Sequence, residues 1–207
     1  MRKLTLLALL TFLCASANAT DVSFTNGGQF DNDTDGSAAV FADATITTVS
    51  LGGSATALNE NAGLLGATGG ASNTRWDSGE SWTFEFNKAV SIDTIGFNVF
   101  GSVDDEATLQ SADWIGLGFI ENDVDLSFND TTGAFTFTGG TNRNFDLATI
   151  VTGGVSLSAS SDLTFSSTGT SNFEITALKF TVVPEPQTYA LLACFCGLFG
   201  STLRRCR

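Results

Sequence analysis

Apolar residues alternate with small or polar ones through most of the middle of the chain, and this alternation constrains the fold more than any other feature. It begins clearly with Trp82, Phe84 and Phe86. The same period of two recurs in Ile95/Phe97/Val99, Ile115/Leu117/Phe119, Val124/Leu126/Phe128, Phe135/Phe137, Val155/Leu157, Leu163/Phe165, Phe173/Ile175 and Phe180/Val182. Such runs indicate strands with one buried face, and Gly, Asn and Asp clusters separate them at short spacing. The sequence therefore predicts an all-β fold, an antiparallel β-sandwich or a jelly roll.

The segment before residue 76 is less regular. Residues 38–41 and 45–51 have the alternation of strands, whereas residues 52–74 are rich in Gly, Ala, Ser and Asn. We expect the latter to form a long loop. No Pro-rich or strongly charged linker divides residues 20–183, so one domain is predicted.

The charge and the residue types that are missing exclude several function classes. The 207 residues include 9 Lys and Arg against 22 Asp and Glu, a formal net charge of −13, and no His. A chain without His has no His-containing triad and no His-ligated zinc site. An acidic balance also argues against a nucleic-acid partner, which needs a basic face.

Basic residues and cysteines are concentrated at the two ends of the chain. Five of the nine basic residues and all four cysteines lie within residues 1–19 and 184–207. All but one of the acidic residues lie in residues 20–183. We therefore predict two terminal signals that flank one body. A body without cysteine has to be stabilised by burial of its core or by a metal ion, because it forms no disulfide.

Residues 1–19 have the three parts of a secretory signal peptide. Arg2 and Lys3 precede an apolar run over residues 4–14, and Ala17 and Ala19 place small residues before Thr20. This order predicts cleavage by signal peptidase between Ala19 and Thr20. The body is then exported.

The other terminal segment, residues 184–207, has three features in a fixed order. Pro184, Glu185 and Pro186 come first, and a 15-residue apolar run, residues 189–203, follows. The basic residues Arg204, Arg205 and Arg207 come last. The run predicts a single short hydrophobic helix, although a full bilayer span needs about 20 residues. The arginines would stay on the cytoplasmic side and leave the body outside. A plain C-terminal anchor and a buried core helix are the alternatives.

These features together resemble the PEP-CTERM sorting signal. The resemblance covers the tail and the signal peptide and says nothing of the body. It implies that an exosortase, a membrane peptidase of Gram-negative bacteria, recognises the tail and cleaves near Pro184–Pro186. It also implies a transient inner-membrane anchor, followed by transfer of the body to the cell surface or the extracellular matrix. Cys194 and Cys196 in the apolar run and Cys206 among the arginines depart from the usual composition of such tails.

One loop has the oxygen-rich composition of a calcium site. It reads Asp31-Asn32-Asp33-Thr34-Asp35-Gly36. Carboxylates at alternate positions of a turning loop, here Asp31, Asp33 and Asp35, can converge on Ca²⁺. The twelfth position of an EF-hand loop would be Ala42, so the loop is not an EF-hand. The alternatives are a structural Ca²⁺ site, the one cofactor that we consider, and a solvated acidic turn.

The tryptophans divide by their position in the alternation. Trp82 is in phase with Phe84 and Phe86, which predicts a core residue. Trp114 is out of phase with Ile115 and precedes a glycine-rich stretch, and Trp76 lies in an expected loop. Aromatic rings on an outer sheet face can stack on a sugar. We therefore take Trp114 and Trp76 as a candidate ligand platform, with packing under a loop or in the other sheet as the alternative.

These features favour a non-enzymatic surface or matrix protein with extracellular polysaccharide as a candidate partner. The likeness of such sandwiches to carbohydrate-binding modules is an analogy of fold only. One alternative is an extracellular glycan hydrolase that uses a carboxylate pair, for which residues 104–106 and 121–123 supply acids without a selective spacing. The other alternative is a purely structural or adhesive protein.

Overall fold

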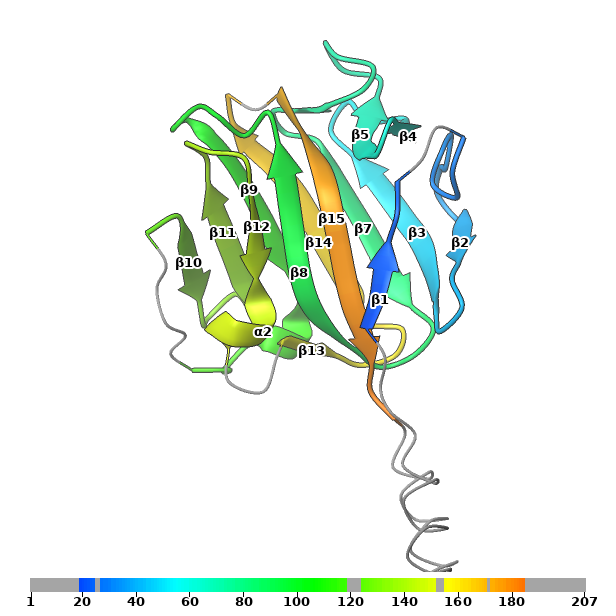
Figure 1. The fold of residues 1–207 in the computed structure, drawn as a ribbon, viewed down its shortest axis with the longest axis vertical. Coiled ribbons are helices and arrows are strands. Elements are labelled where there is room, and N and C mark those ends of the chain that lie inside the picture. The colour runs from blue at the N-terminus through cyan, green and yellow to red at the C-terminus, as the bar shows by residue number, and fades with distance from the viewer. Residues whose placement is uncertain (1–18, 25–26, 119–123, 152–154, 171, 185–207) are drawn as a thin grey trace, which may run out of the picture. The chain divides into compact units, whose positions relative to one another are not determined.

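Antiparallel strands in two sheets form the framework of the structure, a computed structural model that describes residues 19–24, 27–118, 124–151, 155–170 and 172–184 (Figure 1). Ala19–Val182 forms one compact unit, and residues 1–18 and 183–207 belong to another. The predicted all-β class is confirmed, as a β-sandwich. The predicted C-terminal helix lies outside the described residues.

The strands are β1 (Ala19–Val22), β2 (Ala38–Val40), β3 (Thr45–Gly52), β4 (Ala57–Asn61), β5 (Leu64–Thr68), β6 (Trp76–Asp77), β7 (Ser81–Phe86), β8 (Val90–Asn98), β9 (Asp105–Gln110), β10 (Leu126–Asn129), β11 (Ala134–Thr138), β12 (Arg143–Asp146), β13 (Val155–Leu157), β14 (Asp162–Gly169) and β15 (Asn172–Val182).

The two sheets differ in strand order, and the first has three strands that pair outside its main order. The first has the order β12-β8-β15-β5-β4, with β1 and β6 also paired to β15 and β13 paired to β8. The second has the order β10-β11-β9-β14-β7-β3-β2. Two single turns of helix interrupt the strands, the 3-10 helix η1 (Ala112–Trp114) and α2 (Leu147–Ile150). Because β1 pairs with β15, the last strand of the body lies beside its first strand.

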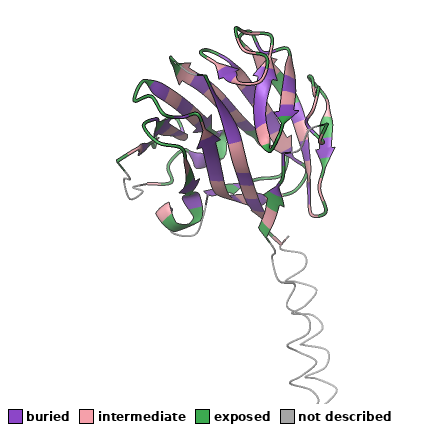
Figure 2. Cartoon of the chain, turned by 45° about the horizontal axis from the view of Figure 1, so that its top comes forward, coloured by how far each residue is buried: buried purple, intermediate pink, exposed green. Residues whose placement is uncertain are grey.

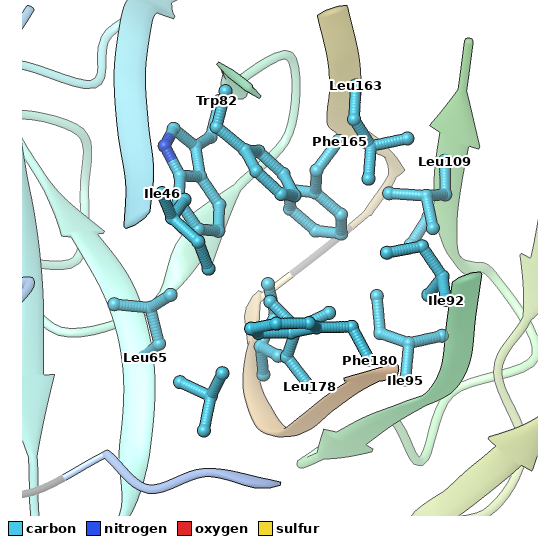
Figure 3. Packing of buried hydrophobic residues seen from close by; sticks show 14 of the residues in the cluster. Ile46, Leu65, Trp82, Ile92, Ile95, Leu109, Leu163, Phe165, Leu178 and Phe180 are labelled. Atoms are coloured by element: carbon cyan, nitrogen blue, oxygen red, sulfur yellow. The ribbon is translucent and has the colours of Figure 1, made fainter. Parts of the chain in front are cut away.

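The core lies between the sheets and is rich in phenylalanine. Phe97 of β8 faces Phe137 of β11 across the sandwich, with ring centroids 5.4 Å apart. Phe180 of β15 meets Phe86 of β7 at 4.9 Å. Figure 3 shows side chains of both sheets filling the space around Phe180, and Figure 2 shows buried residues alternating with intermediate ones along the strands. Burial of each large apolar side chain contributes about 1.5–3 kcal/mol, which supports a body that has no disulfide.

Bulges explain why the alternation in the sequence changes phase. In β15 the buried apolar residues are Phe173 and Ile175 and then Leu178 and Phe180, a shift from odd to even numbers. The pairing with β8 shifts between Ile175 and Ala177 and again between Lys179 and Phe180. An extra residue in one strand turns all later side chains to the other face. The two short strands expected at the end of the body are therefore one long strand.

The long loop expected over residues 52–74 is wrong, because a hairpin of β4 and β5 occupies its middle. Asn61 pairs with Leu64, and the two residues between them, Ala62 and Gly63, both have positive φ. Positive φ at both positions is the mark of a type I′ turn, which suits the twist of a two-residue hairpin. The alternation of apolar and polar residues does not show in the sequence of these two strands, because β5 contains small residues and β4 places Glu60 on its buried face.

Candidate functional site

The candidate ligand platform at Trp114 and Trp76 is wrong, because both indole rings are buried. Each residue is 0% exposed. Trp114 donates its Nε1–H to the carbonyl oxygen of Ser156 at 2.9 Å, and Trp76 donates to that of Leu65 at 3.1 Å. Neither ring face is open to a ligand. The third tryptophan, Trp82, is 1% exposed, which confirms its predicted place in the core.

A local break in the strand pattern explains the error at Trp114. The strand expected from Ile115 onward does not form over residues 115–118, which are a turn and a loop that follow the 3-10 helix η1 directly. Ser111 caps η1 by accepting a hydrogen bond from the N–H of Asp113. The helix turns Trp114 inward and leaves Ile115 and Leu117 on the surface, 56% and 42% exposed. This is the reverse of the phase that the alternation predicted. Ser111-Ala112-Asp113 is a capping sequence, the signal that could have revealed the turn.

The acidic loop over residues 31–36 connects the two sheets. Asp31 Oδ1 accepts a long hydrogen bond from the N–H of Glu60 in β4, at 3.4 Å. Asp35 Oδ1 accepts one from the N–H of Leu51 in β3, at 2.9 Å. Asp31 and Asp35, the first and last of the predicted calcium ligands, therefore accept hydrogen bonds from strands of different sheets. These bonds attach the loop to both sheets.

Asp33, the middle predicted ligand, has the most unusual environment of the three. Its Oδ2 is buried without a hydrogen-bond partner among the described residues. Burial, together with the neighbouring charge of Asp31, raises the pKa of the Asp33 carboxyl. Within the described part of the chain, no group of three acidic side chains is arranged to hold a metal ion. The calcium site stays a prediction that rests on Asp33.

A second buried carboxylate, which the sequence analysis missed, lies in the turn between β6 and β7. Glu80 is 0% exposed. Its Oε1 accepts the hydroxyl of Ser54 at 2.8 Å and its Oε2 accepts the N–H of Asp77 at 2.8 Å. Burial is the main reason why the pKa of Glu80 is raised. Asp77 in turn accepts the N–H of Ser72 at 2.7 Å, so the two acids hold three loops together.

A polar network lies where β6, β8 and β15 meet. The carboxylate of Glu174, only 6% exposed as a residue, accepts the amide of Asn98 at 3.1 Å and lies 3.6 Å from Nε of Arg75. Asn142 donates its amide to Asn98 at 3.0 Å. Arg75 also donates to the side chain of Asn172 at 3.4 Å. Amide, carboxylate and guanidinium groups are thus gathered in one patch, which we call the Arg75 network.

Of the described acids that we considered for hydrolysis, two accept hydrogen bonds within the local structure, and the third, Asp104, is exposed. Asp105 accepts the N–H of Ser102 at 3.0 Å. Glu106 accepts the hydroxyl of Thr168 at 2.8 Å. Residues 121–123 lie outside the described residues. The described carboxylates give us no pair to which a catalytic role can be assigned.

The predicted processing residues flank a single ladder. Ala19 and Thr20 are the first residues of β1, and Pro184 follows the end of β15 by two residues. Ala17, Glu185, Pro186, Arg204, Arg205 and Arg207 lie outside the described residues. None of the helices in the described part has the length and apolar content that a bilayer span requires.

Comparison of the chain with families of known proteins, with curated proteins and with solved structures gave no match.

Proposed function

We propose that this chain is an exported, non-enzymatic protein of the bacterial cell surface or extracellular matrix that an exosortase sorts. The observation that carries the proposal is the sequence of features in the tail: Pro184-Glu185-Pro186 comes first, an apolar run follows, and an arginine cluster comes last. The predicted signal peptide over residues 1–19 accompanies this tail.

The intact mass of the protein from its native host, fractionated into membrane, surface and medium, tests this proposal. We expect a product that begins at Thr20, ends near Pro184–Pro186 and lies outside the membrane. Glu185→Gln should retain the tail and accumulate in the membrane. Gln187→Ala, just beyond the motif, is the matched control and should be processed normally. A wild-type mass that still includes Arg207, found in the membrane, would make the tail a plain anchor.

Extracellular polysaccharide is the partner that we propose for the body, with the Arg75 network as the contact. Sugar hydroxyls are both donors and acceptors, and guanidinium, amide and carboxylate groups side by side can satisfy both. The exposed part of the network includes Arg75, whose side chain is 37% exposed, and the exposed residues Asn142 and Asn172. This assignment replaces the tryptophan platform.

Retention of the mature protein on polysaccharide purified from its own host tests this contact. Arg75→Ala should reduce retention at least about tenfold, the effect of losing about 1.4 kcal/mol. Lys88→Ala removes a similar charge at the loop of Asp43 and should leave retention unchanged. Equal retention of both variants and the wild type would leave a structural or adhesive role without a sugar ligand.

A further inference from the structure

We infer that Val99 completes the Arg75 network as a binding site for a neutral sugar ring. The valine side chain then lies against the apolar face of the ring, and the network binds its hydroxyls. This inference rests on the proposed function, from which it takes the polysaccharide partner, and it adds a contact residue and the charge class of the sugar.

Val99, directly after the end of β8, has a backbone conformation that valine rarely adopts. Its φ is 59°, in the left-handed region. A β-branched residue is a clear outlier there, because its Cβ lies too close to the neighbouring carbonyl oxygen. Glycine adopts such a φ without this cost, and asparagine adopts it more readily than most residues. Valine is therefore poorly suited to the backbone at this position.

The core explains the conformation of the backbone. Side chains alternate along a regular strand, so Phe97 on the inside would place Val99 inside and Phe100 outside. Instead Phe100 is 0% exposed, and its ring centroid lies 4.8 Å from that of Phe97 and 4.9 Å from that of Phe173. The left-handed residue reverses the phase of the chain and brings Phe100 into the core. Val99 is left on the surface, 37% exposed.

The core does not explain why this residue is a valine. Glycine or asparagine would give the same reversal with less strain. A side chain that is 37% exposed gains less from burial than a core residue does, and this gain has to offset the strain. Residues held in strained conformations cluster at ligand-binding sites. The valine side chain is therefore a ligand contact.

Val99 lies beside the Arg75 network. Asn142 spans it, because its Nδ2 donates to Oδ1 of Asn98 at 3.0 Å and its Oδ1 accepts the N–H of Phe100 at 2.9 Å. Figure 1 shows this end of β8 at the upper edge of the sandwich, where β15 begins. An exposed apolar side chain thus adjoins amide groups. This combination fits a sugar ring, which has an apolar face and hydroxyls at its edge.

The charges of the network favour a neutral sugar over an acidic one. Arg75 is the basic residue among the described members of the network, and its Nε lies 3.6 Å from Oε1 of Glu174. The other members, Asn98, Asn142 and Asn172, are uncharged amides. The chain as a whole has a formal net charge of −13. An acidic polysaccharide would meet a cation that Glu174 already balances, and the acidic body would repel it.

Retention of the mature protein on polysaccharide from its own host, separated by anion exchange into a neutral and an acidic fraction, tests the inference. Wild type should be retained on the neutral fraction. Val99→Ala shortens the side chain and keeps its Cβ, whereas Val99→Gly also removes the strain. Each variant should reduce retention at least about fourfold, the effect of one lost methylene contact. Val99→Gly should keep or raise the melting temperature, because glycine adopts a positive φ freely.

The matched control is Val40→Ala, which shortens a valine that is 63% exposed in β2. Its retention should equal that of the wild type. A clear fall in the melting temperature of Val99→Gly would make the valine a stabilising residue and would overturn the inference. A drop in retention for Val99→Gly alone would implicate the backbone and would also overturn it, as would retention of the wild type on the acidic fraction alone.

The Arg75→Ala variant separates this inference from the proposed function. Full retention of both Val99 variants, with retention of Arg75→Ala reduced, would overturn the inference and leave the proposed sugar contact in place. Equal retention of all variants, Arg75→Ala included, would overturn both.

Discussion

Trp114 donates its indole N–H to the carbonyl oxygen of Ser156 at 2.9 Å, and this bond joins η1 to β13 beneath the sandwich core. The ring also packs edge-on against Phe135, with centroids 5.3 Å apart. An aromatic residue that an alternating pattern places outside is thus a structural anchor. Trp76 and Trp82 are also buried and hydrogen-bonded: their indole N–H groups donate to the carbonyl oxygen of Leu65 and to the hydroxyl of Thr48.

Trp114→Phe should destabilise the body by about 2–4 kcal/mol. The change removes the hydrogen bond to the carbonyl of Ser156, which contributes about 0.5–1.5 kcal/mol, and it leaves a cavity beside Phe135. Urea unfolding monitored by circular dichroism measures the effect. Leu117→Ala, at an exposed position three residues on, is the control and should change the free energy of unfolding by less than about 0.5 kcal/mol. Similar midpoints for the two variants would contradict the anchoring role.

Glu80→Gln should change how stability depends on pH. The pKa of Glu80 is raised in the folded state, so its stabilising contribution is complete below the unfolded pKa and is lost as pH rises through the folded value. Wild type should therefore gain stability relative to Glu80→Gln when pH is lowered from 7 into the acid range. Thermal unfolding of both proteins across pH checks this. Parallel curves would show that the burial of Glu80 has no effect on its protonation.

Asp113→Asn should show the opposite pH dependence. The N–H of Ser158 bonds to the Asp113 carboxylate at 2.6 Å, and this bond lowers the pKa of Asp113. Its stabilising contribution is present above the unfolded pKa and is lost as pH falls through the folded value. Wild type should thus be more stable than Asp113→Asn at neutral pH, and the difference should shrink in acid. A difference that grows in acid would argue against this bond as the cause.

Calcium binding, if the loop of Asp33 provides it, should raise the melting temperature with added CaCl₂. A ligand that binds only the folded state stabilises it by RT ln(1 + [L]/Kd), about 2.7 kcal/mol at one hundred times Kd. Asp33→Asn removes the buried, unpartnered oxygen charge and should abolish the shift. Asp104→Ala, an exposed acid of another loop, should keep it. Equal melting temperatures with CaCl₂ and with a chelator in the wild type would contradict the hypothesis.

The pattern of the sequence was sufficient wherever strands are regular. The alternation of Trp82, Phe84 and Phe86 predicted β7 and its buried face, because side chains of a strand point alternately to two sides. It failed at η1 and at the β4–β5 hairpin. A single helical turn reverses the phase, and small residues carry little hydrophobic signal.

The sequence by itself determined the fold class and the charge, and it predicts the two terminal signals, because all of these depend on local composition and periodicity. The tertiary structure decided which polar groups meet. Glu80 with Ser54, Asp31 with Glu60 and Glu174 with Arg75 are pairs of residues that are distant in the chain or lie on different elements. It also placed β1 beside β15, so that the first residues of the body are held by its last. Strand pairing depends on the register and bulges of the whole sandwich, and these follow from the packing of all its side chains together.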